Sequence, residues 1–338
     1  MQNTSDRITR VLGSRATPLA FLAALALGAC AAPAGGLYSD VKLSGPEKSV
    51  LNADSNPMMV HVALKDGANP NVYGRQGRTP LHVHVCREVT PDTLKVVDIL
   101  LGAGASPNRR EKDWEGGDTA LHRALKCHSG DRNLPVLLAK LLEGGANPNL
   151  AAVGARTPLF TAIEFSRPGG DADLARVVSV LLRGGAVPDA HLDSGNTPLH
   201  HLMCSRDAAR GKRGHKAPST KLKTIAALLK GGADPNREKV FSGNFASEGD
   251  RHAHYDERGI FAGEDGPYHY EDFHSGPPLS FACNPRAVAA LIEAGADVGH
   301  AAKIALQDGR SRVVAAMIDS GVDPALLNAQ GEIAEQPQ

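Results

Sequence analysis

The chain has 338 residues, of which 42% are hydrophobic and 22% are charged, a composition typical of a globular protein. Its 37 basic and 37 acidic residues cancel, so no global positive field attracts nucleic acid, and a nucleic-acid partner is not expected. The length suits either two compact domains or one elongated repeat array.

Residues 1–29 are typical of a cleaved secretory signal. A start with three arginines is followed by an apolar stretch over 16–27, which is too short to cross a bilayer as a mature helix. The next residues, LGAC, end at Cys30 and resemble the lipobox of bacterial lipoprotein signal peptides. The resemblance implies cleavage before Cys30 and acylation of that cysteine with lipid such as palmitate. Ala31 in the next position implies the outer membrane, with the protein facing the periplasm. An ordinary secretory signal with an unrelated cysteine is the alternative.

Two short phrases repeat along the chain after a small-residue stretch, 30–45, that is predicted to be a flexible tether. The first phrase occurs as GRTPLH at 77–82, GDTALH at 117–122, ARTPLF at 155–160 and GNTPLH at 195–200. The second phrase occurs as GAGASPN at 102–108, GGANPN at 144–149, GGAVPD at 184–189 and GGADPN at 231–236.

Each phrase has a physical reason for its residue types. Thr caps the first free amides of a helix, and Pro suits the first helical position because it needs no amide partner. Gly permits the left-handed turn that closes a helix. With apolar residues at helical spacing in between, each unit is predicted to be a helix, a loop, a second helix and a glycine-closed turn. One such pair cannot bury its apolar face alone, so neighbouring units must stack.

TPLH followed by two helices and GADPN resembles the ankyrin repeat. The resemblance implies an all-α solenoid of about seven helix-turn-helix units over residues 46–330, with one long inserted loop. The predicted units lie near 46–76, 77–116, 117–154, 155–194, 195–236, 277–299 and 300–327. It also implies that the histidines of the first phrase tie neighbouring turns together by hydrogen bonds, a structural role expected for His82, His122 and His200.

Four cysteines besides Cys30 lie near the ends of the predicted first helices: Cys86, Cys127, Cys204 and Cys283. The pairs Cys86/Cys127 and Cys204/Cys283 fall on adjacent units, and an exported protein with an even cysteine count favours disulfides. Stacked helices, however, lie ~10 Å apart, whereas a disulfide needs Cα atoms within ~7 Å. Bridged cysteines and small buried side chains both remain open.

Residues 237–276 form a predicted insertion between the fifth and sixth units, rich in aromatic, histidine and carboxylate side chains. A metal site would use His252, His254, His269 and His274, although their spacing on a glycine-rich loop is a weak signal. General acid–base chemistry lacks a partner nucleophile. Recognition is favoured because aromatic side chains dominate interface energies, and the candidate contact residues are Tyr255, Phe261, Tyr268, His269, Tyr270 and Phe273. A flap that packs on the sixth unit is the structural alternative.

No catalytic motif stands out in the chain, neither a nucleophile elbow, a phosphate-binding glycine loop, HExxH nor CxxC. We therefore expect a non-enzymatic, monomeric protein-interaction module without a cofactor, anchored by lipid in the bacterial cell envelope. It would bind an unidentified protein through its concave face and the insertion, as an immunity or inhibitor lipoprotein or as an envelope scaffold. The alternative is a periplasmic metal-binding or redox-protective protein that uses the histidine-rich insertion.

Overall fold

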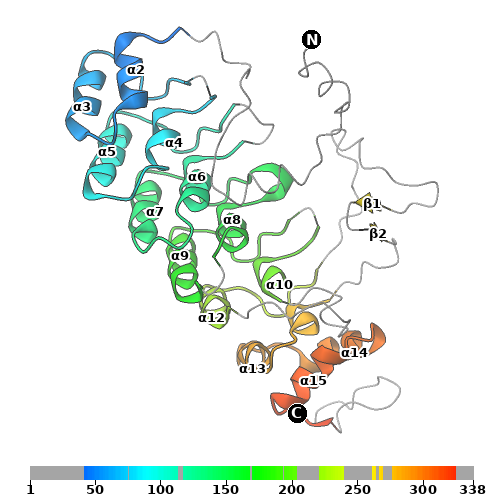
Figure 1. The fold of residues 1–338 in the computed structure, drawn as a ribbon. Helices are drawn as coiled ribbons and strands as arrows, with labels where there is room; N and C mark the ends of the chain where they lie inside the picture. The colour runs from blue at the N-terminus through cyan, green and yellow to red at the C-terminus, as the bar shows by residue number, and fades with distance from the viewer. Residues whose placement is uncertain are drawn as a thin grey trace, which may run out of the picture.

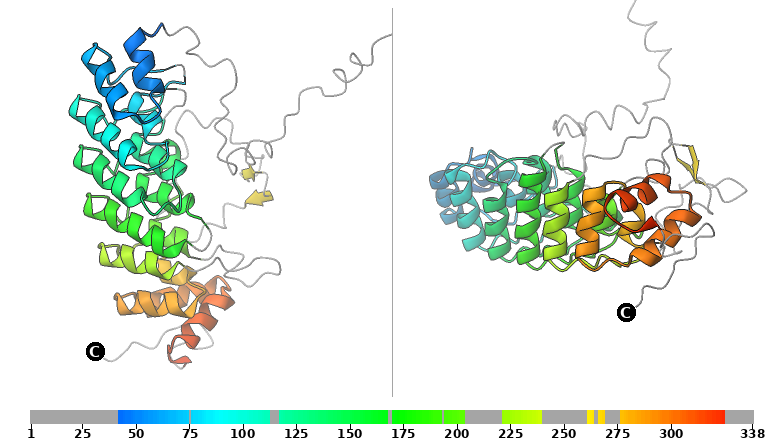
Figure 2. Two further views of the ribbon diagram at one scale, coloured as in Figure 1. Left: turned by 60° about the vertical axis from the view of Figure 1, so that its left-hand side comes forward. Right: turned by 90° about the horizontal axis from the view of Figure 1, so that it is seen from below.

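The structure is a computed structural model that describes residues 42–74, 76–112, 117–167, 170–192, 194–203, 221–239 and 276–324. It also describes the backbone of two short strands at 261–263 and 266–268. Helices stack in pairs between residues 45 and 319 and build a curved array (Figures 1 and 2). The predicted all-α solenoid is confirmed.

Two rows of helices run along the array. The first row consists of α2 (Gly45–Asn52), α4 (Pro80–His84), α6 (Ala120–Cys127), α8 (Pro158–Glu164), α10 (Pro198–Leu202), the 3-10 turn η4 (Pro278–Phe281) and α14 (Val298–Gln307). The second row consists of α3 (Pro57–Lys65), α5 (Pro91–Gly102), α7 (Leu134–Glu143), α9 (Asp171–Arg183), α12 (Leu222–Lys230), α13 (Pro285–Glu293) and α15 (Ser311–Asp319). Each helix contacts the next in its own row, so every unit packs on its sequence neighbours.

The ends of the helices follow the repeated phrases. Thr79, Thr119 and Thr197 are the N-caps of α4, α6 and α10, and in each the histidine three positions later completes a reciprocal capping box. The second helices close at glycines in the left-handed region, such as Gly145 at φ 87°. These caps satisfy the backbone groups that a helix end leaves without an internal partner.

The first helix of the first unit starts one residue before the predicted array. Ser44 caps α2, and Glu47 returns the bond to the Ser44 backbone N–H, so the helix begins at Gly45 inside the stretch predicted as tether. The Ser-x-x-Glu pattern was the signal for this start.

One continuous apolar core runs between the two rows. Each central unit places a fully buried leucine from both helices into it, for example Leu121 with Leu141 and Leu159 with Leu181. Because each unit covers the core of the next, stability is shared between neighbours.

The insertion contains a feature that the sequence did not predict. Strands β1 (Phe261–Gly263) and β2 (Gly266–Tyr268) pair antiparallel, with Phe261 opposite Tyr268. Among the described residues, no helix is both long enough and apolar enough to span a membrane.

Candidate functional site

The histidines of the first phrase connect the second, third and fifth units to the turns that follow them. The Nδ1 atom of His82 lies 2.8 Å from Oγ1 of Thr79, and its Nε2 lies 3.1 Å from the carbonyl oxygen of Asp118 in the next unit. Because a carbonyl oxygen can only accept, Nε2 carries the ring proton and Nδ1 is the acceptor. His122 makes the same contact with the carbonyl oxygen of Arg156 at 3.0 Å. The tie between neighbouring turns that the resemblance implied is present.

Burial keeps these imidazoles neutral. Desolvation lowers the pKa of His82 and of His200 to about 4, and it lowers the pKa of His122 as well. The histidines therefore serve as uncharged connectors between turns.

Asparagines at the end of the second phrase form a parallel set of connections, a role that the sequence analysis missed. Asn108 Nδ2 donates to the carbonyl oxygen of Gly145 at 2.9 Å, and its Oδ1 accepts the Asn147 N–H at 2.7 Å. Asn71, Asn149 and Asn236 make equivalent pairs of bonds. The recurring final Asn of SPN, NPN and DPN was the available signal.

The copy of the phrase at 184–189, GGAVPD, ends in aspartate and breaks this pattern. Asp189 accepts the Asp234 N–H at 3.0 Å, but a carboxylate cannot donate to the neighbouring carbonyl. Burial raises the pKa of Asp189. This junction is therefore held by fewer bonds than those on either side.

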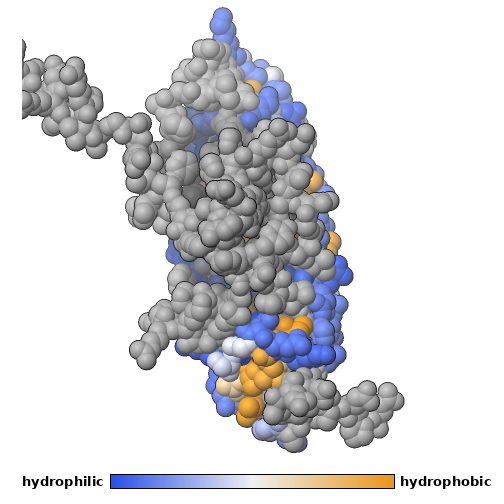
Figure 3. Space-filling model, turned by 90° about the vertical axis from the view of Figure 1, so that its right-hand side faces the viewer, coloured by the Kyte–Doolittle hydropathy of each residue, from blue (hydrophilic) through white to orange (hydrophobic). Residues whose placement is uncertain are grey.

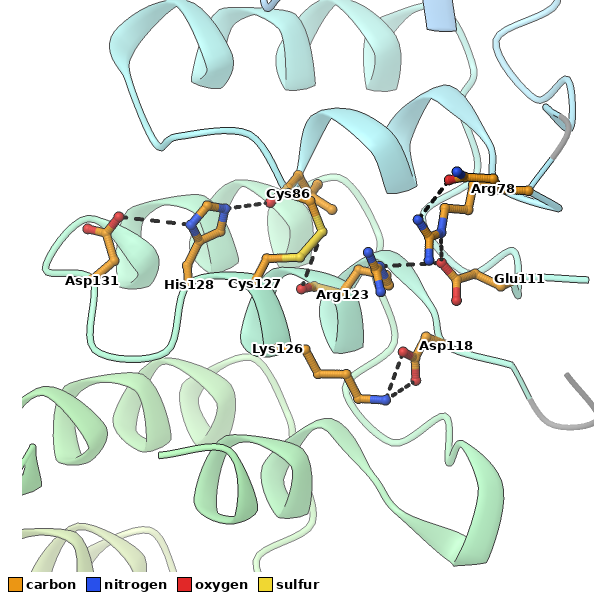
Figure 4. Close-up of a disulfide and its surroundings, with 11 residues drawn as sticks. Arg78, Cys86, Glu111, Asp118, Arg123, Lys126, Cys127, His128 and Asp131 are labelled. Atoms are coloured by element: carbon orange, nitrogen blue, oxygen red, sulfur yellow. Dashed lines mark hydrogen bonds and ion pairs between the residues drawn. A yellow bond between two sulfur atoms is a disulfide. The ribbon is translucent and has the colours of Figure 1, made fainter. Parts of the chain in front are cut away.

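An ionic cluster lies between the second and third units (Figure 4). Glu111 is buried, with Oε1 2.7 Å from Arg78 Nε and 3.3 Å from Arg123 Nε. Burial raises the pKa of Glu111, and the two arginines oppose that shift. Asp118 pairs with Lys126 at 2.8 Å beside the cluster. These paired charges fix the loop between the helix pairs relative to α6.

A disulfide joins the same two units. Cys86 and Cys127 are bonded, with Cα atoms 5.3 Å apart (Figure 4). The spacing of stacked helices does not apply here, because α4 ends at His84 and Cys86 lies in the turn after it, free to approach the last residue of α6. Cys283 is also disulfide-bonded, while Cys204 lies outside the described residues.

The insertion leaves and rejoins the array at one point. The Lys239 N–H donates to the carbonyl oxygen of Gly276 at 3.1 Å, and the same oxygen accepts from His200 Nε2 at 2.9 Å. The histidine contact that elsewhere joins adjacent turns is thus kept across the insertion. A side chain on Gly276 would collide with Ser280 Oγ, since its Cβ would lie 2.7 Å away.

Buried side chains of the last two units support this junction. The Arg310 guanidinium lies 3.9 Å from the ring centroid of Phe281, and its Nη1 donates to the Ser280 carbonyl oxygen at 2.7 Å. Asp308 accepts from Arg310 Nη2 at 2.5 Å. The base of the insertion therefore rests on an ordered part of the array.

A family model for the ankyrin repeat matches residues 194–239, which include α10, α12 and the junction with the insertion. This segment of the all-α solenoid is therefore similar to an ankyrin repeat. The chain is 38% identical over 91 residues to the ankyrin repeat protein FPV232 of fowlpox virus. It is 33% identical over 114 residues to the E3 ubiquitin-protein ligase KEG of Arabidopsis thaliana. These matches cover 27% and 33% of this chain but 17% and 6% of the two relatives. The transient receptor potential channel pyrexia of Drosophila melanogaster is 32% identical over 122 residues, 28% of this chain and 12% of the relative.

Half-buried aromatic rings lie beside lysine side chains at the loops next to the first-row helices. Lys112 Nζ lies 4.1 Å from the ring centroid of Tyr73, whose hydroxyl donates to the Arg110 carbonyl oxygen at 3.2 Å. Lys126 lies over Phe165 of the next unit at 5.3 Å from the ring centroid. Figure 3 shows a mostly hydrophilic described surface, with hydrophobic residues gathered toward the C-terminal end.

The structure does not place the side chains that the sequence proposed for recognition in the insertion. Phe261 and Tyr268 are described as paired strand backbone, and their side chains, with those of Tyr255, His269, Tyr270 and Phe273, lie outside the described residues. The metal candidates His252, His254, His269 and His274 also lie outside them. Within the described ranges, no group of three potential metal-ligand side chains occurs.

Proposed function

We propose that this solenoid is a non-enzymatic binding module at a bacterial envelope membrane. It holds a protein partner against its insertion and against its loop edge, the side of the array that carries Tyr73, Lys112, Lys126 and Phe165. Ankyrin repeats are interaction modules, and the coarse function follows from the family that the chain resembles. The observation that carries the finer proposal is the junction at Gly276. There, an aromatic-rich insertion is fixed to the array by both Lys239 and His200.

Rigidity is what the array supplies to such a site. The histidine and asparagine bonds hold the loop edge in one shape before any partner arrives, so little conformational entropy is lost there on binding. Tyr73, Lys112, Lys126 and Phe165 offer cationic and aromatic contact groups on that edge. Tyrosine is among the residue types that contribute most to protein interfaces.

The envelope location rests on two supports. The LGAC sequence at 27–30 provides an acylation cysteine, and the Cys86–Cys127 disulfide suits an exported protein in an oxidising compartment. A lipid-anchored interaction module there would act as an immunity or inhibitor lipoprotein that neutralises an incoming protein, or as a scaffold for envelope proteins.

Affinity purification of the lipidated protein tests the proposal. One form keeps the insertion, and in the other two glycines replace residues 240–275, since the bond between Lys239 and Gly276 shows that the two ends already meet. We expect proteins captured by the intact form to be lost from the shortened form. Circular dichroism and the melting temperature of the shortened form control for folding. Equal capture by two well-folded forms would remove the insertion from the function. Mass analysis of the Cys30 peptide tests the anchor separately.

A further inference from the structure

The second-row helix of the first unit, α3, has three exposed large apolar side chains, whereas its described counterparts have at most one, such as Val136 of α7. Met58, Met59 and Val62 are 69%, 51% and 44% exposed. They lie on one side of the helix, because positions three and four apart share a face. Val60 and Ala63, by contrast, point into the core and are buried.

Comparison of equivalent positions explains part of this exposure. Met59 lies eight positions before the left-handed Gly67. The residues eight positions before the equivalent glycines of later units are at most 5% exposed, and these are Val96, Leu137, Val177, Thr224, Ala287 and Val313. The preceding second-row helix covers them. No helix precedes α3 in its row within the described residues, so Met59 belongs to an open end of the stack.

An ordinary preceding helix would not cover the whole surface. The position of Met58 faces solvent in later units, where five of the six equivalents are charged, namely Lys95, Arg176, Lys223, Arg286 and Arg312, and the sixth is the exposed Val136. Terminal units of stacked repeats normally present polar residues outward to stay soluble. Among the described second-row helices, α3 alone combines this position with two further exposed apolar side chains, Met59 and Val62, and a patch of three indicates a broader apolar cover than one neighbouring helix provides.

The chain before the array indicates which cover is available. Cys30, the lipid attachment point in the proposed function, lies twelve residues before Lys42, where the described array begins. A fully extended chain of that length reaches about 40 Å. Since α2 packs directly on α3, this unit is the part of the array held nearest to the bilayer. Lys65 at the exposed end of α3 adds a cation of the kind that favours anionic lipid headgroups.

We propose that Met58, Met59 and Val62 form a membrane-contact surface that inserts into the lipid headgroup region and orients the array on the bilayer. This inference rests on the proposed lipid anchor at Cys30. The anchor supplies proximity, and the α3 surface fixes which end of the array touches the membrane. The loop edge and insertion are then held in a defined direction for a partner.

Methionine footprinting tests the inference on the complete lipidated protein in vesicles of phosphatidylethanolamine and phosphatidylglycerol. The reference is the unlipidated chain from Ala31 in solution. We expect oxidation of Met58 and Met59 by hydroxyl radicals to fall severalfold on vesicles, while oxidation of exposed Val136 and Val187 stays unchanged. Equal oxidation in the two samples, with acyl chains present on Cys30, would overturn the inference and leave the anchor standing. Absence of acyl chains would overturn both. If Met58 and Met59 already resist oxidation in the unlipidated chain in solution, then protein covers the surface, and this result would also overturn the inference.

A matched pair of tryptophan variants gives an independent readout. Val62→Trp and Val136→Trp place the reporter on exposed positions of two second-row helices, α3 and α7, above the background of the natural Trp114. Brominated phospholipid should quench the added emission of V62W and leave that of V136W unchanged. Equal quenching of the two, or none of either, would contradict a membrane contact at α3.

Discussion

His200 donates from Nε2 to the carbonyl oxygen of Gly276 at 2.9 Å, so the histidine of the fifth unit holds the residue at which the insertion rejoins the array. Replacement by alanine should lower the free energy of unfolding by about 1–2 kcal/mol, because the buried carbonyl oxygen loses one of its donors. Urea denaturation of H200A measures this loss. His201→Ala is the control, since its imidazole is on the exposed side of the same helix. A smaller effect for H200A than for H201A would contradict the assigned role.

Acid should weaken the array through its buried histidines. The pKa of His82 and His200 is about 4 in the folded protein and 6.5 in the unfolded chain, so below pH 6.5 the unfolded chain binds more protons. Stability is then complete above pH 6.5 and is lost as the pH falls toward 4. Each histidine accounts for roughly 2 kcal/mol at pH 5. Urea unfolding at pH 7.5 and pH 5 measures the difference in unfolding free energy. In His82→Gln, this difference between the two pH values should be smaller. Equal stability at both pH values would count against neutral buried imidazoles.

The fourth unit offers a test of the capping contact, because Phe160 replaces the histidine there. In the described part of the chain, Thr157 Oγ1 is buried without a hydrogen-bond partner, whereas Thr79 Oγ1 lies 2.8 Å from His82 Nδ1. Thr79→Val should cost about 1–2 kcal/mol, and Thr157→Val should change the unfolding free energy by less than about 0.5 kcal/mol. Chemical denaturation of the two variants compares them directly. Equal losses would show that the histidine adds nothing to the cap.

Asp189 marks a position where stability can be gained. Asparagine there would donate to the next unit, as Asn149 donates to the Gly185 carbonyl oxygen at 2.8 Å. D189N should raise the free energy of unfolding by about 1 kcal/mol, and the reverse change N149D should lower it by a similar amount. Thermal unfolding measures both. A loss of stability in D189N would mean that the Asp234 N–H needs the carboxylate.

Reduction of the disulfide should loosen the second and third units. The Cys86–Cys127 bond closes a 41-residue separation, and its loss should cost about 2–4 kcal/mol. Melting temperature with and without reductant measures the change. The double variant C86A/C127A shows how much of the response belongs to this bond, since Cys283 takes part in another disulfide. If reductant lowers the melting temperature of C86A/C127A as much as that of the unchanged chain, the contribution of the Cys86–Cys127 bond would be contradicted.

Local patterns predicted the fold because each repeated residue acts on atoms a few positions away. Thr79 and His82 cap one helix, and Gly145 closes another, so phrase and structure agree. Contacts between units were harder to foresee. Asn108 forms hydrogen bonds with Gly145 and Asn147 of the next unit. The recurrence of this asparagine in the sequence does not reveal that its side chain bonds to the following unit.

The disulfide and the junction depended on chain geometry. Helix spacing argued against a Cys86–Cys127 bond, yet the five-residue length of α4 moves Cys86 past the helix end and within range. Likewise, the support of the insertion by Arg310 and Phe281 joins residues that share no repeated phrase with His200. Such contacts follow from the stacking of units.

The affinity of a purified partner for the intact and the shortened array tests the central claim most directly. Calorimetry would compare the lipid-free chain with the form in which two glycines replace residues 240–275, at equal folded fractions. The account predicts that Kd rises at least about tenfold in the shortened form, equivalent to ~1.4 kcal/mol or more of lost binding free energy. Equal Kd values for the two forms would contradict it.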